Sequence, residues 1–476
     1  MNLKTTKTEQ KEEWKKEDYK TLRNDVLQLL GENPKKVSEK IVKEILMHEY
    51  IYTTRDDARN EMWIYKEGIY IPQGKSFIRE ICREILGSFY NTLTAYEVTS
   101  KIEVDTAIKK EDFFINNYIY EIPVINGILN IKTKKLIPFN PTKIFFSKIP
   151  IKYNPNAKCP AINKFLSEIM ADKTDKNVFY EIAGFCLHKE YTFEKAFMFL
   201  GTGRNGKSKC LELIKRAIGA ENCFSLPLNA LKSDNADLSQ LFGKMVNLAG
   251  DIGYEDLKDT ATFKSLTGRD LITARRKFLT AITFENYAKF IFSCNQLPKV
   301  YDLSKAFWDR WILIEFPYYF ATKEELAIAD ITTKDKWKER DENIISKITQ
   351  PDEFSGFLNE ILTGYDRLMQ NKKFSTTKGT EEVKSTWMRL ADSFYAFCEE
   401  NIASSNDEVK DRVPKRELRK KYKEYCTKHN LKMSNDKYIQ EFLEKNYFVS
   451  TKQDSSYEYL WTGLKMKDYI YQKSNS

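Results

Sequence analysis

The sequence has few of the residues that build disulfide frameworks, zinc sites or membrane spans. Only 3 histidines occur among 476 residues, and the 8 cysteines are scattered without a C-x-x-C pair. This pattern argues against a structural zinc site or a disulfide framework and is typical of a reducing cytoplasm. No apolar run approaches the roughly 18 to 20 residues of a membrane span, and the chain begins with charged residues. We therefore expect a soluble, cytoplasmic protein without a membrane partner.

The composition is that of a folded protein with several cores. Hydrophobic residues make up 42% of the chain and charged residues 30%, and a chain of this length usually forms about two to four domains. The formal net charge is +9, from 77 Lys and Arg against 68 Asp and Glu. Because this excess is small, attraction to a polyanion must come from local patches, and a Lys-rich protein without such a partner is an equal alternative.

Changes in texture divide the chain into five segments. Residues 1–45 are a charged, partly helical lead-in, and residues 46–160 are a mixed α/β domain. Residues 161–330 are an α/β core, residues 331–384 a helical connector, and residues 385–476 a separate terminal domain.

The terminal segment combines helices with strands. Helical spacing appears over 387–400, 415–428 and 436–445, and aromatic strand-like residues follow at 447–449 and 457–461. Helices followed by a two-stranded wing are typical of a winged-helix module, which predicts a DNA-binding domain here.

The strongest pattern is a phosphate-binding loop. Gly201-Thr202-Gly203-Arg204-Asn205-Gly206-Lys207-Ser208 matches G-x-x-x-x-G-K-[ST], follows a short apolar strand over 197–200 and opens a helix. Glycines let the main chain wrap a triphosphate, Lys207 brings charge to the β- and γ-phosphates, and the Ser208 hydroxyl suits Mg²⁺. We therefore expect ATP and Mg²⁺ as cofactors.

Two later strands end in polar residues suited to hydrolysis. Asp251 ends one apolar run and is assigned to Mg²⁺ or its water shell. Glu255, four residues on, either polarises the attacking water or starts a helix in solvent. Asn295 ends the other strand and either holds the lytic water or forms a turn before Pro298.

In combination, these motifs resemble the motor core of superfamily 3 helicases, and most closely the phage, plasmid and poxvirus primase-helicase group. The resemblance rests on the phosphate-loop spelling, on Asp251 and on Asn295, and it covers the chain from about residue 50 to the end. It implies an α/β fold with a P-loop AAA+-like three-layer motor core at 161–330, a helicase-associated N-terminal domain and a C-terminal winged-helix module.

The resemblance also implies DNA contacts and a catalytic site shared between subunits. Residues 263–278 resemble a motif of such helicases whose hairpin carries basic residues into the ring channel. The candidate DNA contacts here are Lys264, Arg275, Arg276, Lys277 and Phe278. The segment from Ala306 to Trp311 resembles an arginine-finger motif, so we expect Arg310 to reach the γ-phosphate held by a neighbour. For duplex phosphates the candidates are Lys415, Arg416 and Lys420, with a solvated Lys-rich face as the alternative.

These expectations lead to a ring-shaped motor. A residue that acts on a neighbour's site requires head-to-tail subunits, and a closed homo-oligomer, a hexamer by resemblance, is the simplest solution. The first hypothesis is an ATP-dependent DNA helicase that translocates on single-stranded DNA in replication of a mobile genetic element or virus, with a separate primase or polymerase as a partner. The alternatives are an ATP-dependent origin-binding initiator or loader without processive unwinding, and a packaging or remodelling ATPase.

Overall fold

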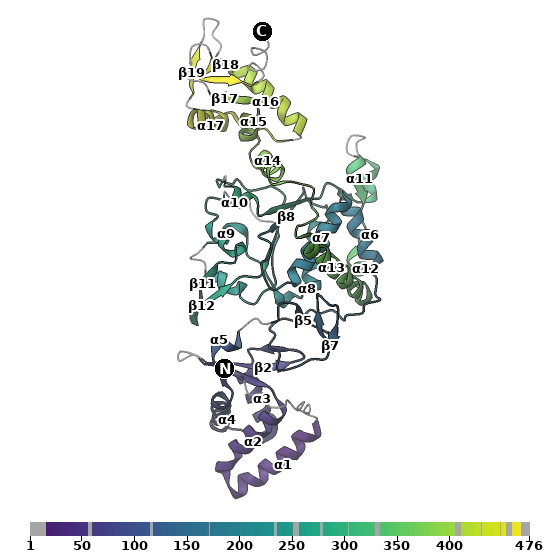
Figure 1. The fold of residues 1–476 in the computed structure, drawn as a ribbon, viewed down its shortest axis with the longest axis vertical. Coiled ribbons are helices and arrows are strands. Elements are labelled where there is room, and N and C mark those ends of the chain that lie inside the picture. The colour runs from purple at the N-terminus through teal and green to yellow at the C-terminus, as the bar shows by residue number, and fades with distance from the viewer. Residues whose placement is uncertain are drawn as a thin grey trace.

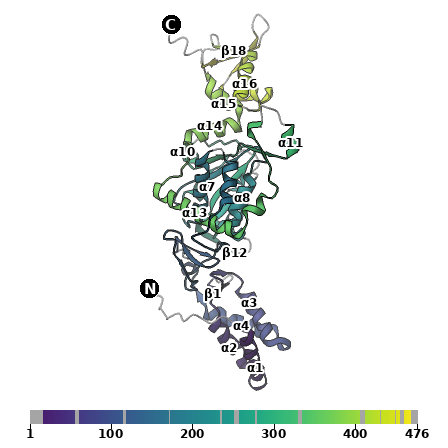
Figure 2. The same ribbon diagram turned by 90° about the vertical axis from the view of Figure 1, so that its right-hand side faces the viewer.

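A computed structural model describes most of the chain and shows an elongated molecule. Helix α1 lies at one end, and strands β18 and β19 lie at the other (Figures 1 and 2). The described residues are 16–55, 60–114, 118–170, 172–232, 236–250, 257–276, 279–302, 304–328, 334–404, 411–429, 431–447, 449–453 and 459–467. Within them, no helix is both long enough and apolar enough to cross a bilayer.

Three separate hydrophobic cores define three units. The N-terminal unit (residues 16–114) has a core from Leu22 to Ile102. The central unit (118–391) has the largest core, from Ile122 to Trp387. The C-terminal unit (392–467) has a core from Phe394 to Met466. Each unit therefore buries its own apolar residues, as separately packed layers do.

The N-terminal unit packs helices against one side of a small sheet. Leu22 and Val26, which fall in the expected lead-in, are buried with the helices that follow. Its sheet has the order β3-β2-β1-β4. The elements are α1 (Lys16–Glu32), α2 (Val37–His48), β1 (Ile51–Thr54), β2 (Glu61–Lys66), β3 (Ile69–Ile71), α3 (Gly74–Leu86), α4 (Thr92–Asp105), β4 (Ala107–Ile108) and α5 (Lys110–Phe113).

A three-stranded sheet joins the N-terminal unit to the central one. It consists of β5 (Glu121–Val124), β6 (Gly127–Asn130) and β7 (Leu136–Ile137), in that order. Its buried side chains, such as Ile122 and Leu129, belong to the central core. The structure thus divides the segment 46–160, which the sequence treats as one domain.

The central unit is built on a five-stranded sheet with the order β14-β8-β13-β10-β9, in which every pairing is parallel. The strands are β8 (Ala196–Leu200), β9 (Cys223–Phe224), β10 (Val246–Ala249), β13 (Lys289–Cys294) and β14 (Trp311–Glu315). The main helices are α6 (Pro160–Ile169), α7 (Lys173–Leu187), α8 (Lys207–Ile218), α9 (Ala261–Thr267), α10 (Lys305–Trp308), α12 (Ile344–Ile348), α13 (Pro351–Asn371) and α14 (Thr380–Ala391). Between β14 and α12 lie β15 (Tyr319–Ala321), α11 (Lys323–Ala327) and β16 (Trp337–Glu339). The segment 331–384, which the sequence predicts to be helical, is therefore not wholly helical, because it contains β16.

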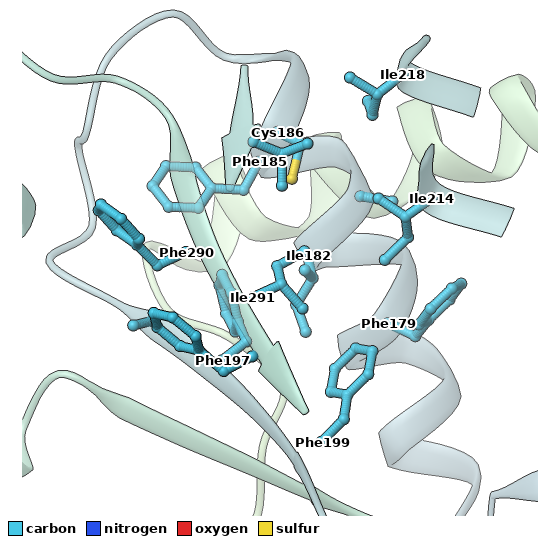
Figure 3. Close-up of a cluster of buried hydrophobic side chains, with 14 of the residues drawn as sticks. Phe179, Ile182, Phe185, Cys186, Phe197, Phe199, Ile214, Ile218, Phe290 and Ile291 are labelled. Atoms are coloured by element: carbon cyan, nitrogen blue, oxygen red, sulfur yellow. The ribbon is translucent and has the colours of Figure 1, made fainter. Parts of the chain in front are cut away.

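The apolar strands of this sheet are covered by helices. All five residues of β8 are buried, as expected for a strand in a parallel sheet with covered faces. Phe179, Ile182 and Phe185 of α7 and Ile214 and Ile218 of α8 pack near the strands (Figure 3). These contacts fix the direction of β8, and therefore fix where the loop that follows it emerges.

Helices α7 and α13 approach each other closely at two glycines. A Cβ added at Gly184 would lie 2.8 Å from the Ile361 carbonyl oxygen, and one added at Gly364 would lie 2.6 Å from the Tyr180 backbone. Any side chain there would push the helices apart. The glycines therefore set the spacing of the layer that covers the sheet.

The C-terminal unit differs in detail from its sequence pattern. The helix expected over 387–400 is broken at Asp392, whose side chain caps α15 by accepting the Tyr395 backbone N–H. Of the strand expected at 447–449, Tyr447 instead ends α17, Phe448 lies outside the described residues, and β19 begins at Ser450. The elements are α15 (Ser393–Asn401), β17 (Ile402–Ser404), β18 (Arg412–Pro414), α16 (Lys415–His429), α17 (Asp436–Tyr447), β19 (Ser450–Gln453), β20 (Tyr459–Thr462) and β21 (Leu464–Met466), with β18-β20-β19 in one sheet. The overall class is mixed α/β, as the sequence indicates.

Candidate nucleotide site

The loop from Gly201 to Ser208 lies at the carboxyl end of β8 and leads directly into α8. Gly203 and Gly206 have φ values of 95° and 93°, in the left-handed region where glycine is favoured. A Cβ at Gly201 would lie 2.0 Å from the Asn205 side-chain nitrogen. Gly206 is the N-cap of α8, so the loop places the positive end of the helix dipole at its mouth.

Lys207 crosses the loop instead of pointing into solvent. Its Nζ donates to the Gly201 carbonyl oxygen at 2.5 Å, to Asn205 Oδ1 at 3.2 Å and to Asn295 Oδ1 at 3.0 Å. Asn295 follows β13, which is paired with β8. The structure therefore brings together two residues that the sequence singles out 88 positions apart.

The loop is also held from outside by the segment after β14. Arg204, at φ 45°, donates to Tyr319 Oη at 2.9 Å and to Glu325 Oε1 at 2.8 Å. Its carbonyl oxygen accepts from the Phe320 backbone N–H at 2.7 Å. Sequence reasoning missed Tyr319 and Glu325 because no spacing rule links them to the loop.

A cavity of about 450 Å³ opens beside the loop. Its lining includes residues of the loop and the residue that follows β13, namely Gly203, Gly206, Lys207, Ser208 and Asn295. The lining also includes apolar side chains, namely Phe165, Ile169, Phe320, Ile344 and Ile345, and charged ones, namely Glu168, Glu339, Arg340, Asp341 and Glu342. Backbone donors and a lysine suit the phosphates of a nucleotide, and apolar side chains suit its base.

Two of the residues expected to bind ATP and Mg²⁺ lie where the sequence predicts them. Lys207 and the exposed Ser208 are both at the cavity, and bound Mg²⁺ would neutralise charge on the phosphates. Strand β10 ends at Ala249, next to β13. Asp251 and Glu255, the predicted metal and water-polarising residues, lie outside the described residues.

Arg310 lies at the opposite end of the same sheet. Its backbone oxygen accepts from the Ala196 N–H at the start of β8, whereas the phosphate loop follows the end of that strand. The guanidinium pairs with Glu194 at 2.7 Å, donates to Thr267 Oγ1 at 2.9 Å and also donates to the Ala306 carbonyl oxygen. The Arg310 side chain is only 12% exposed. Contacts within the chain therefore hold the guanidinium at this end of the sheet, away from the phosphate loop of the same chain.

The predicted DNA hairpin forms an antiparallel pair, β11 (Leu271–Arg276) and β12 (Leu279–Glu285). Arg275 is exposed on it. Lys277, Phe278 and the side chain of Arg276 lie outside the described residues. Lys264 does not extend from the hairpin, because it is on α9 and pairs with Asp302 at 2.9 Å.

The three basic residues predicted to bind duplex DNA differ in their surroundings in the C-terminal unit. Arg416 and Lys420 are exposed on α16. Lys415 lies with its Nζ 4.1 Å from the centre of the Trp461 ring. A cation–π contact of this kind fixes the ammonium group, so Lys415 ties α16 to β20.

Two further lysines are buried near the amino end of the sheet. Lys289 donates to the carbonyl oxygens of His188 and Tyr287, and Lys189 donates to that of Glu121 at 3.1 Å. Burial lowers the pKa of each to about 7, because water no longer stabilises the charged form. Neither lies in the cavity beside the phosphate loop.

Comparison with known proteins identifies relatives among viral proteins. Residues 43–171 match the family described as D5 N terminal like, and residues 199–310 match a family of unknown function. A protein of Acanthamoeba polyphaga mimivirus is 28% identical over 171 residues, which is 34% of this chain and 18% of the relative. A Sputnik virophage protein is 24% identical over 358 residues, which is 72% of this chain and 44% of the relative. Both are described as a "putative helicase", and the chain spans less than half of either.

The solved structure of the NrS-1 C-terminal region in its apo form is also similar. It is 15% identical, covers 89% of this chain and 98% of its own length, and gives a TM-score of 0.47. The D5 N terminal like match and the viral relatives described as putative helicases confirm the resemblance to the phage and viral helicase group that the motifs indicate.

Proposed function

We propose that the protein is an ATP-dependent DNA helicase that acts in the replication of a virus or mobile genetic element. In this proposal the central unit is a P-loop AAA+-like motor, and the C-terminal unit is a winged-helix-like module. The observation that carries the proposal is the Lys207–Asn295 contact, which joins the phosphate loop to the end of the neighbouring parallel strand. The viral relatives described as helicases add support.

The chemistry follows from the end of the sheet at which Lys207 lies. Lys207 and the N-terminus of α8 bind the phosphates, and Ser208 and Asp251 hold Mg²⁺. Asn295 is close enough to Lys207 to orient a water near the γ-phosphate. Glu255 is the candidate that polarises this water.

The position of Arg310 supports a ring. Five residues of β8 separate its backbone contact from the phosphate loop, a span of about 16 Å at about 3.3 Å per residue. Arg310 therefore serves the site of a neighbouring subunit, and head-to-tail subunits close into a homo-oligomer, which we propose to be a hexamer. In the ring, Arg310 must exchange its ion pair with Glu194 for the γ-phosphate of its neighbour.

The DNA would meet the motor at the hairpin of β11 and β12. The hairpin projects Arg275, and its tip carries Lys277 and Phe278 in the sequence. Basic and aromatic side chains grip successive nucleotides without reading their bases. The exposed Arg416 and Lys420 on α16 are the candidate contacts to duplex phosphates.

Strand displacement on forked DNA tests the proposal. Wild-type protein is expected to separate the strands when ATP and Mg²⁺ are present, and Lys207→Ala is expected to separate none. Arg216→Ala is a matched control, because Arg216 lies on the same helix but is exposed, pairs with Glu212 at 2.7 Å and does not line the cavity. ATP hydrolysis stimulated by DNA without any strand separation would contradict the proposal and would favour an origin-binding initiator or loader.

A further inference from the structure

One turn of the central unit touches both the phosphate loop and the C-terminal unit. The turn runs from Asn295 to Asp302, after β13. At its start, Asn295 accepts the hydrogen bond from Lys207. Four residues later, Lys299 Nζ lies 2.9 Å from Asp392 Oδ2 and 2.9 Å from Tyr438 Oη. Tyr438 is on α17, so the two ends of a short turn reach two different units.

From Leu297 onward the turn is packed against neighbouring residues, whereas Asn295 and Gln296 at its start are exposed. Leu297 is 1% exposed and Val300 6% exposed. The Pro298 carbonyl oxygen accepts from the indole N–H of the fully buried Trp387 at 2.9 Å. Lys299 and Tyr301 are also bonded to the backbone of Leu257. Close-packed residues transmit displacement instead of absorbing it, so this packing provides a route between Lys299 and the start of the turn.

The contact with the C-terminal unit is centred on one shielded carboxylate. Asp392 is 12% exposed and stands between α14 and α15. It accepts from Lys299 and from the Tyr438 hydroxyl, and its other oxygen caps α15. The ammonium of Lys299 also lies 4.2 Å from the centre of the Tyr438 ring. Partial burial strengthens such a pair relative to one in open solvent, so the position of α17 depends on where Lys299 lies.

We infer that the 295–302 turn couples the nucleotide site to the C-terminal unit, with Lys299 as a positioning residue. Binding of duplex DNA to the C-terminal unit displaces α17, and Lys299 carries this displacement to Asn295 and Lys207. The reverse also holds, because a coupling between two binding sites is reciprocal. This inference rests on the proposed function and adds how DNA engagement controls ATP use.

ATP turnover with and without duplex DNA tests the coupling. Lys299→Met removes the charge at similar length, and Tyr438→Phe removes one hydroxyl. We expect each variant to lower the ratio of DNA-stimulated to unstimulated turnover by about 5-fold or more, the usual lower range for coupled sites. The double variant should lose no more than either single variant, because both changes break one connection. Lys299→Arg should restore the ratio, which a general loss of packing would not allow.

Lys465→Met is the matched control. Lys465 pairs with Asp411 at 2.7 Å inside the C-terminal unit and does not reach the turn, so the wild-type ratio is expected. The coupling would be overturned if Lys299→Met kept the wild-type ratio. It would also be overturned if the wild-type protein hydrolysed ATP but duplex DNA did not stimulate this hydrolysis. A wild-type protein that hydrolyses no ATP under any condition would instead contradict the proposed function. In that case the coupling is tested by the binding of a non-hydrolysable nucleotide. Duplex DNA must change the affinity of the wild-type protein for this nucleotide, and must not change that of Lys299→Met.

Discussion

The two ends of the central sheet each hold a buried lysine, but the lysines have different surroundings. Lys207 lies at the carboxyl end of β8, next to a cavity and the N-terminus of α8. Lys289 begins β13 at the amino end, where carbonyl oxygens and the rings of Phe185 and Tyr191 surround it. Both are nearly inaccessible, at 4% and 0% exposed. Burial is therefore common to both lysines, and the difference between them is that Lys207 lines a cavity and Lys289 does not.

The same contrast applies to Arg310. It shares the amino end of the sheet with Lys289, and its own chain satisfies its donors. Unlike Lys289, it keeps a partner that is itself more than half exposed, because Glu194 is 56% exposed. An ion pair that is open on one side can be exchanged, whereas a lysine enclosed by carbonyl oxygens cannot. Our proposal that Arg310 acts on a neighbouring subunit depends on this difference.

The largest effect is expected at Lys207. Lys207→Ala should lower kcat/KM for ATP by on the order of 10⁴-fold, since both phosphate binding and charge stabilisation in the transition state are lost. Steady-state ATP turnover measures this change, and thermal unfolding should stay close to wild type. An unfolding loss as large as that of a core mutation would mean that Lys207 is structural, like Lys289.

The next largest effect is expected at Arg310. Arg310→Ala should lower turnover by about 10³-fold and leave nucleotide binding intact, because an arginine finger acts on transferring charge. Mixing this variant with Lys207→Ala should restore turnover to about a quarter of wild type, since random mixing in a ring pairs an intact Lys207 with an intact Arg310 at that frequency. No recovery on mixing would assign Arg310 to its own chain.

Lys289 should affect stability and its pH dependence. Its pKa is about 7 in the folded chain, against 10.5 for the ordinary side chain, so between these values the unfolded chain binds more protons and stability rises with pH. Lys189 contributes in the same direction. Between pH 7 and pH 9, the free energy of unfolding of Lys289→Met should therefore rise by about 2 kcal/mol less than that of the wild type. Urea unfolding at both pH values measures this difference, and an equal gain in both proteins would contradict the assignment.

The smallest effect is expected at Arg204. Its contacts with Tyr319 and Glu325 are exposed, and exposed ion pairs contribute little to stability. Arg204→Ala should loosen the phosphate loop and weaken ATP binding by about 2- to 5-fold. Titration with a fluorescent nucleotide can resolve this change. A loss as large as that in Lys207→Ala would place Arg204 on the phosphates themselves.

Local patterns predicted the strand, loop and helix around residues 197–218 better than they predicted the elements of the C-terminal unit. The phosphate loop combines an apolar strand, glycines and a helix start, and all three depend on neighbouring residues. At the break, one oxygen of Asp392 caps α15 and the other accepts from Lys299 and Tyr438, which are distant in sequence. Lys264 was likewise assigned to DNA from its place in a motif, whereas the fold pairs it with Asp302.

The sequence by itself determined that strand 197–200 is buried, that the turn after it needs glycine, and that a lysine and a serine open the next helix. These features follow from side-chain volume, backbone freedom and charge over a few residues. Only the tertiary structure decided which distant residues meet: Asn295 at Lys207, Glu194 at Arg310 and Asp392 at Lys299. The physical reason is that strand order, and not spacing along the chain, decides which ends of the strands are neighbours.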